Sequence, residues 1–236
     1  MHKTPIILDC DTGVDDAIAI MLANQITNFD LRCITTVAGN VDVDKTTANT
    51  LRVLELIKAD IPVYRGAALP IFSDPVRAGH VHGNDGLGGI ELPLHRSEIS
   101  GIPSWDTIYS EAIRCGGDLE IIAIGPLTNL GMAFIKYKNL PDLIHRIVIM
   151  GGSATSGNIT PAAEFNIYAD PEAAAIVFSS GVPVYMCGLD VTLQAFYTAG
   201  DLDQIAALGN QPAIFFRDVA QDLLAFSLNL GWPGIC

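Results

Sequence analysis

The chain has 236 residues, of which 50% are hydrophobic and 17% are charged, a composition that excludes a mainly disordered or fibrous protein. Its 13 Lys and Arg against 26 Asp and Glu give a formal net charge of −13, which argues against nucleic acid and anionic membranes as partners. The length suits one layered α/β unit, so we expect a single domain over residues 1–236.

Short apolar runs alternate with amphipathic stretches along most of the chain. In chain order, this pattern predicts a strand at 6–8, a helix at 15–23, a strand at 33–38, a helix at 44–59, a strand at 62–64, a helix at 105–115, a strand at 119–124, a helix at 127–137, a strand at 144–150, a helix at 171–178, a strand at 183–187, and helices at 202–208 and 212–230. Residues 66–103 and 151–169 lack periodicity and are predicted as loops. The alternation predicts a Rossmann-like three-layer α/β sandwich with a mainly parallel central sheet.

The cysteines and the amino terminus indicate in which cellular compartment the protein is expected. Five cysteines without paired CxxC spacing indicate reduced thiols rather than a disulfide framework or a zinc site. No apolar run reaches the roughly 18–20 residues of a membrane span, and residues 1–7 do not resemble a secretory signal. We therefore expect a cytoplasmic protein.

Polar side chains follow several of the predicted strands. Because ligands bind outside the carboxyl ends of parallel strands, these side chains are expected to meet at one rim of the sheet. The candidates are Asp9, Asp11, Asp15, Asp16, Asn40, His82, Thr128, Asn158, Glu164 and Asn166.

The densest acidic segment is DCDTGVDD, with Asp9, Asp11, Asp15 and Asp16. Four carboxylates so close together repel one another unless a cation or shared protons offset the charge, and oxygen ligands favour Ca²⁺ or Mg²⁺. A plainer alternative is that Asp15 caps the following helix, but this leaves the other three carboxylates unexplained.

Seven sequence blocks occur in a distinctive order. They are DCDTGVDDAIAIMLA (9–23), TTVAGN (35–40), AGHVHG (78–83), GPLTNL (125–130), MGG (150–152), AEFNIYADPEAA (163–174) and GLDVT (188–192). In order and interval they resemble the inosine–uridine preferring nucleoside hydrolase family, over nearly the whole chain. The resemblance implies the nucleoside hydrolase fold and hydrolysis of ribonucleosides to free base and ribose, an activity of purine and pyrimidine salvage.

The resemblance also implies roles for individual residues. Asp11, Asp16 and the main-chain carbonyl of Thr128 would ligate one Ca²⁺ ion, with Asp11 also the general base toward a water that attacks C1′. The implied substrate contacts are Asp15 and Asn166 at the ribose hydroxyls, Glu164 and Asn158 at the outer part of the ribose, and Asn40 and His82 near the water or the base. The family's habit implies a homo-oligomer, a dimer or tetramer. The preferred base stays open.

Family members continue with a segment that begins with a His-Asp-Pro motif. Its Asp completes the calcium shell, and its His helps to protonate the leaving base in purine-accepting members. This chain ends at Cys236, so we expect it to be C-terminally incomplete. The alternative to an active hydrolase is therefore a truncated form that binds nucleoside or Ca²⁺ without turnover.

A different hydrolase class also fits the first acidic residues. Asp9-Cys10-Asp11 after a strand is similar to the start of aspartate-nucleophile phosphatases, which pair a nucleophilic Asp with an acidic Asp two residues on. Those enzymes have Thr or Val where Gly13 stands, and the Lys and later acidic pair that they require are not found. We therefore regard the phosphatase as the weaker alternative.

Overall fold

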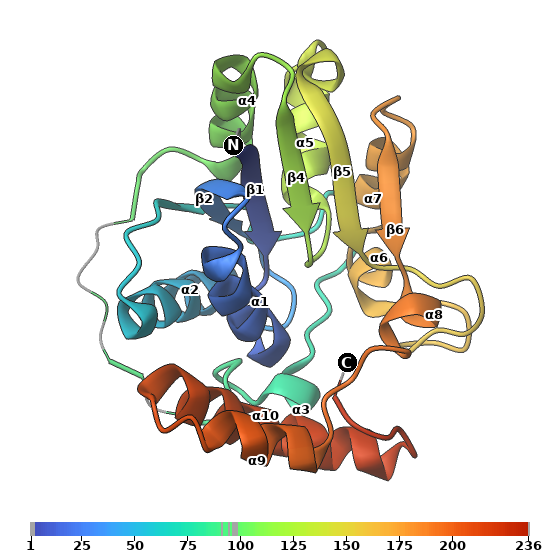
Figure 1. Ribbon diagram of the computed structural model, residues 1–236. Coiled ribbons are helices and arrows are strands. Elements are labelled where there is room, and N and C mark those ends of the chain that lie inside the picture. Colours follow the sequence, from blue (N-terminus) through green and yellow to red (C-terminus); the bar gives the residue numbers. More distant parts are fainter. Residues whose placement is uncertain (1–2, 91, 94, 96–98, 236) are drawn as a thin grey trace.

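The computed structural model describes residues 3–90, 92–93, 95 and 99–235. A central sheet of parallel strands runs through the molecule in the order β3-β2-β1-β4-β5-β6 (Figure 1). The strands are β1 (Thr4–Cys10), β2 (Phe29–Thr36), β3 (Val63–Arg65), β4 (Leu119–Ala123), β5 (Ile144–Met150) and β6 (Val184–Cys187). Each pair of neighbours is parallel, which confirms the predicted α/β fold class.

Helices cover both faces of this sheet and its carboxyl end (Figure 1). They are α1 (Val14–Gln25), α2 (Val43–Ile57), α3 (Gly79–His82), α4 (Ser104–Cys115), α5 (Thr128–Lys136), the 3-10 helix η1 (Leu140–Leu143), α6 (Phe165–Ala169), α7 (Pro171–Phe178), α8 (Leu189–Thr192), α9 (Ala199–Ala206) and α10 (Gln211–Asn229). Within the described ranges, no helix is long and apolar enough to cross a bilayer.

The predicted loops and the starts of two elements need correction, one of them β2, which begins at Phe29, four residues before its predicted start. The short helices α3 and α6 lie inside segments predicted as loops. Their four and five residues make little more than one helical turn, which is too short for a periodic hydrophobic pattern to be recognised. Helix α9 begins three residues before its predicted start, since Thr198 Oγ1 accepts a hydrogen bond from Asp201 N and the Asp201 carboxylate bonds back to Thr198 N. This capping box fixes the helix start before its apolar residues appear.

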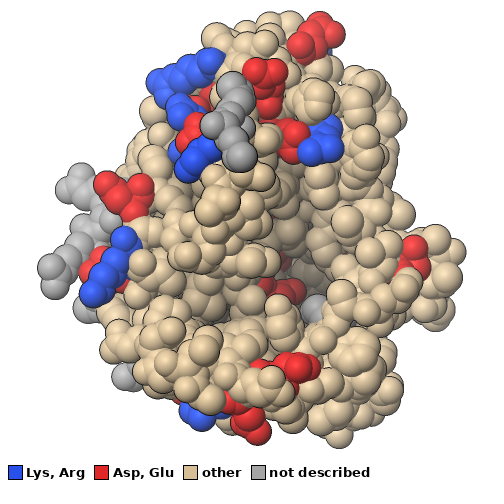
Figure 2. Space-filling model, in the orientation of Figure 1, with Lys and Arg blue, Asp and Glu red and all other residues tan. Residues whose placement is uncertain are grey.

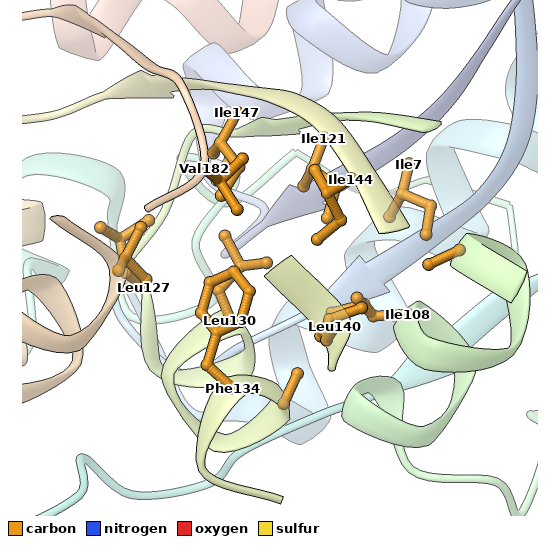
Figure 3. Packing of buried hydrophobic residues seen from close by; sticks show 14 of the residues in the cluster. Ile7, Ile108, Ile121, Leu127, Leu130, Phe134, Leu140, Ile144, Ile147 and Val182 are labelled. Carbon is orange, nitrogen blue, oxygen red and sulfur yellow. The ribbon is translucent and has the colours of Figure 1, made fainter. Parts of the chain in front are cut away.

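Alternate residues of the strands feed two separate cores. In β1, Ile7 packs with α4 and α5 residues on one face, and Leu8 belongs to the cluster with α1 and α10 on the other. Figure 3 shows the first cluster, in which Leu130 and Phe134 of α5 lie below Ile147 of β5 in this view. Burial on both faces explains why the strands read as continuous apolar runs.

Helices α9 and α10 lie across the carboxyl end of the sheet (Figure 1). Helix α10 begins at Asn210, whose side chain accepts from Ala213 N at 2.9 Å. It contacts α1, α2, α3 and α9, and its Phe215, Phe216 and Val219 are buried in the second core. The helix is therefore fixed opposite the strand ends, where it can close a cavity.

Candidate active site

A cavity of about 350 Å³ lies between the strand ends and α10. Figure 2 shows this hollow, with acidic atoms inside it. It brings together seven side chains predicted as site residues, which come from four separate segments. They are Asp11, Asp15, Asn40, His82, Asn158, Glu164 and Asn166.

Asp11 follows β1 directly and is 1% exposed. Its Oδ2 accepts from the backbone N of Asn40 at 2.6 Å. A Cβ on Gly39 would lie 2.1 Å from Oδ2, and one on Gly125 would lie 2.6 Å from Oδ1. Two glycines therefore leave the room that this carboxylate occupies. Burial raises the pKa of Asp11 to about 8, against the Asn40 hydrogen bond and with the added charge of Asp15.

Asp16 lies in the first turn of α1, beneath the cavity. Its Oδ2 accepts from Gly13 N at 2.8 Å and from Asn40 Nδ2 at 3.2 Å, whereas its buried Oδ1 has no hydrogen-bond partner. Burial, reinforced by the charges of Asp11 and Asp15, raises the pKa of Asp16 well above its ordinary value. An unpartnered buried carboxylate oxygen is costly unless something else binds it.

These features fit an oxygen-ligated cation. Asp11, directly after β1, and Asp16, in the first turn of α1, are two buried carboxylates five residues apart, and the unpartnered Oδ1 of Asp16 offers a ligand. Thr128, expected to contribute its carbonyl, is the first residue of α5, and its hydroxyl donates to Asp170 Oδ2 at 2.7 Å. In the described part of the chain, no three His, Cys, Asp or Glu side chains form a metal group. The ligand set therefore stays a prediction that includes one carbonyl.

Asp9, the first carboxylate of the segment, faces away from the cavity. It is fully buried, where Thr35 Oγ1 and Asn129 Nδ2 donate to its Oδ1. Burial raises its pKa to about 6, against these two hydrogen bonds. Asp9 joins β1 to β2 and α5, and this position argues against it as a phosphatase nucleophile.

Asp15 and His82 lie next to each other at the acidic end, where Asp15 is exposed and His82 is buried. Asp15 is 54% exposed, and its Oδ1 lies 3.8 Å from His82 Nδ1. The same nitrogen accepts from Val14 N at 3.3 Å. Asp15 also accepts from Asp16 N at 3.1 Å, as the capping alternative requires, but the reciprocal bond to Gly13 belongs to Asp16. Helix capping therefore accounts for part of Asp15 and nothing of Asp11.

The loop between β5 and α6 supplies the side of the cavity that faces Asp15 and His82. Glu164 caps α6, with Oε1 accepting from Asn166 N at 2.9 Å and Oε2 from Gly152 N at 2.8 Å. Burial raises the pKa of Glu164, against these hydrogen bonds. Asn166 Nδ2 donates to the carbonyls of Ile124 and Met150, directly after β4 and at the end of β5. The ends of two strands therefore orient this amide.

Asn158 reaches the cavity from the middle of the same loop. Its Oδ1 accepts from Phe165 N at 2.8 Å, and its backbone N donates to Ala163 O. The loop thus folds back onto the start of α6. This contact places Asn158 beside Glu164 and Asn166 around one end of the cavity.

Sequence reasoning missed the apolar wall of the cavity. The residues of that wall that come from α10 and the turn after it are Leu223, Phe226, Leu230 and Trp232. The periodicity of residues 212–230 indicates an apolar face, but only the packed structure divides that face between the core and the cavity.

Comparison with known proteins identifies relatives over most of this chain. Residues 6–232 match the model of the family described as inosine-uridine preferring nucleoside hydrolase. The non-specific ribonucleoside hydrolase RihC of Shigella flexneri serotype 5b is 48% identical over 83% of this chain and 64% of its own length. The RihC of Escherichia coli K12 is 47% identical over 87% of this chain and 68% of its own length. The chain thus spans just under two thirds of the Shigella protein.

Solved structures agree with this assignment. A plant nucleoside hydrolase, the PpNRh1 enzyme, superposes with a TM-score of 0.94 at 31% identity, over 98% of this chain and 74% of its own. A purine-preferring ribonucleoside hydrolase from Gardnerella vaginalis gives a TM-score of 0.92 at 33% identity, over 98% and 76%. The chain therefore belongs to the inosine-uridine preferring nucleoside hydrolase family.

Proposed function

We propose that this protein hydrolyses the N-glycosidic bond of ribonucleosides to free base and ribose. The observation that carries the proposal is the convergence of Asp11, Asp15, Asn40, Glu164 and Asn166 on one cavity with an apolar opposite wall. Family membership and the names of the relatives, all ribonucleoside or nucleoside hydrolases, support it.

The two ends of the cavity suit the two halves of a nucleoside. Carboxylates and amides are hydrogen-bonding partners for ribose hydroxyls, so we assign the ribose to the acidic end. There Asp15 and Asn166 would bind the inner hydroxyls, and Glu164 and Asn158 the outer part of the sugar. The base would then lie toward the apolar wall, with Asn40 and His82 between the two ends.

Asp11 is the proposed general base. Breaking the ribosyl–nitrogen bond builds positive charge at C1′, which nearby carboxylates stabilise. Burial raises the pKa of Asp11 in the metal-free protein, but as a ligand of the proposed Ca²⁺ ion the group would be held as the carboxylate, which can take a proton from an attacking water. The Asn40 backbone hydrogen bond holds one of its oxygens in place, so the proton acceptor is oriented before substrate arrives.

Calcium is the proposed cofactor. Asp11, Asp16 and the carbonyl of Thr128 would hold it. When bound, Ca²⁺ would neutralise the buried carboxylates and acidify the attacking water. The unpartnered Oδ1 of Asp16 supports a cation at this position.

The test is ribose release from inosine, adenosine, uridine and cytidine, measured in Ca²⁺ and again after chelation. We expect release that chelation abolishes and Ca²⁺ restores, and the relative rates would rank the bases. If the folded chain binds inosine in a calorimeter but releases no ribose, the non-catalytic alternative holds instead. Size-exclusion chromatography with light scattering would test the expected dimer or tetramer.

A further inference from the structure

Helix α2 presents a polar face to the interior. Thr46, Thr47, Asn49 and Thr50 are each no more than 2% exposed. Besides bonds to carbonyls within the helix, this face makes bonds that leave it: Thr46 Oγ1 donates to Val37 O at 2.9 Å, and Thr50 Oγ1 lies 2.6 Å from Thr12 Oγ1. The helix therefore braces the loops at the strand ends with polar contacts.

Asn49 is the member of this face that contacts two loops at once. Its Nδ2 donates to the carbonyl of Thr12 at 3.2 Å and to the carbonyl of Asp85 at 2.8 Å. Thr12 is the residue after Asp11, and Asp85 lies three residues after His82. One amide group thus joins the acidic loop, residues 11–13 between β1 and α1, to the segment 82–86 that runs from the end of α3, called here the His82 loop.

The approach of the His82 loop to α2 is built into its backbone. Gly86 has a φ of +87°, and a Cβ there would lie 2.9 Å from Asn49 Nδ2. One turn before Asn49, Lys45 Nζ donates to the carbonyl of Asn84 at 2.8 Å. Asn49 therefore forms the buried part of a two-point attachment, and Lys45 forms the exposed part.

The attachment bears on how His82 is held. Val14 N donates to His82 Nδ1, and an imidazole nitrogen that accepts a hydrogen bond carries no proton. The neutral ring must then carry its proton on Nε2. Val14 begins α1 directly after Thr12 and Gly13, and His82 ends α3 three residues before Asp85, so the Asn49 bridge joins the two segments that meet at this contact.

We propose that Asn49 is a positioning residue that holds the His82 loop against the acidic loop and so fixes the place and the Nε2-protonated tautomer of His82 in the cavity. The structural part stands on the contacts of Asn49 and His82 alone. The expected effect on turnover rests on the proposed function.

The first test needs no turnover. Side-chain ¹⁵N NMR at fixed pH, with the His82 signals assigned by their loss in His82→Ala, reports the tautomer. We expect wild type to be the Nε2–H form and Asn49→Ala to give averaged shifts of two tautomers. Thr46→Val, which removes a buried hydrogen bond from the same helix without touching either loop, should keep the wild-type signals. Unchanged His82 signals in Asn49→Ala would overturn the proposal.

A milder variant covers the case in which Asn49→Ala does not fold. Asn49→Ser keeps one donor at this position and is expected to move the His82 signals in the same direction by a smaller amount. A folded Asn49→Ser with wild-type signals would count against the bridge as the determinant of the tautomer.

The second test is a double-mutant cycle on ribose release. We expect Asn49→Ala to lower kcat by about tenfold in the wild-type background, with a smaller change in KM, but by less than twofold in His82→Ala. Thr46→Val should change kcat by less than twofold in either background. Equal losses from Asn49→Ala in both backgrounds would mean that Asn49 does not act through His82. If wild type releases no ribose, the proposed function fails, and the NMR test still decides the role of Asn49.

Discussion

The sheet side and the α10 side of the cavity are held in different ways. On the sheet side, Asp11, Glu164 and Asn166 each have backbone hydrogen-bond partners at strand or helix ends. On the α10 side, Phe226 and Leu230 offer apolar surface, and Leu230 is 53% exposed. Directional bonds fix the polar groups that must meet a reacting atom, whereas non-directional packing sets the shape of the remainder. Substitutions should therefore have abrupt effects on the first side and graded effects on the second.

The largest effect is expected from Asp11→Asn. The amide keeps the shape of the carboxylate but cannot accept the proton of water, so kcat for ribose release should fall by about three orders of magnitude. Steady-state kinetics at saturating Ca²⁺ measures this. Near-normal turnover, with circular dichroism matching wild type, would contradict the role of Asp11.

A large loss of stability is expected from Asp170→Ala. The Asp170 carboxylate accepts from Ala173 N, Ile71 N and the Thr128 hydroxyl, so truncation leaves three donors without their acceptor. The free energy of unfolding should fall by about 3 kcal/mol, measured by urea denaturation. The matched control is the exposed Asp60→Ala, which should stay within about 0.5 kcal/mol of wild type. Equal losses of stability in Asp170→Ala and Asp60→Ala would argue against a stabilising role for the three hydrogen bonds to Asp170.

Calcium binding should depend on pH because the buried carboxyl group of Asp11 has a raised pKa. With a pKa of about 8, metal-free folded protein holds a proton on Asp11 below that pH, and the proton must leave when a cation binds. Affinity for Ca²⁺ should fall by about tenfold per pH unit between pH 8 and pH 6, measured by titration calorimetry. A constant affinity over this range would mean that Asp11 is not protonated in the metal-free protein.

The same raised pKa predicts the sign of the stability change without metal. The unfolded chain loses the Asp11 proton near the ordinary value of 3.8, and the folded protein keeps it to about 8. The folded state thus binds more protons between these values, so stability should fall as pH rises through this window. Thermal melting in chelator from pH 5 to pH 8 tests the sign, and a rising melting temperature would contradict it.

The smallest effect is expected on the α10 side. Phe226→Ala should raise KM for nucleosides by up to about tenfold and leave inhibition by free ribose unchanged, because only the base would lie near that wall. Leu228→Ala, at a 53% exposed position of the same helix, is the control and should change neither. Weaker ribose inhibition in Phe226→Ala would show that the two sides are not separable.

Local sequence was sufficient for most of the sheet and its helices. The run 119–124 is apolar enough to be buried on both faces, and the start of the helix at Pro171 is indicated by Asp170 directly before it. The short helices α3 and α6 were not predicted because their few residues show no periodic hydrophobic pattern. The start of α9 was predicted too late because its capping residues, Thr198 and Asp201, precede its apolar stretch.

The sequence by itself determined which residue types gather at the strand ends, because parallel strands bring their carboxyl ends to one rim and the acidic and amide residues follow those ends. Only the tertiary structure decided which of these residues line the cavity and which are buried in the structure around it. It placed Asp9 in a buried network away from the cavity, left Asp16 Oδ1 without a partner and joined two loops through Asn49. It also brought α10 over the site. These outcomes depend on contacts between segments far apart in the chain, which no local pattern encodes.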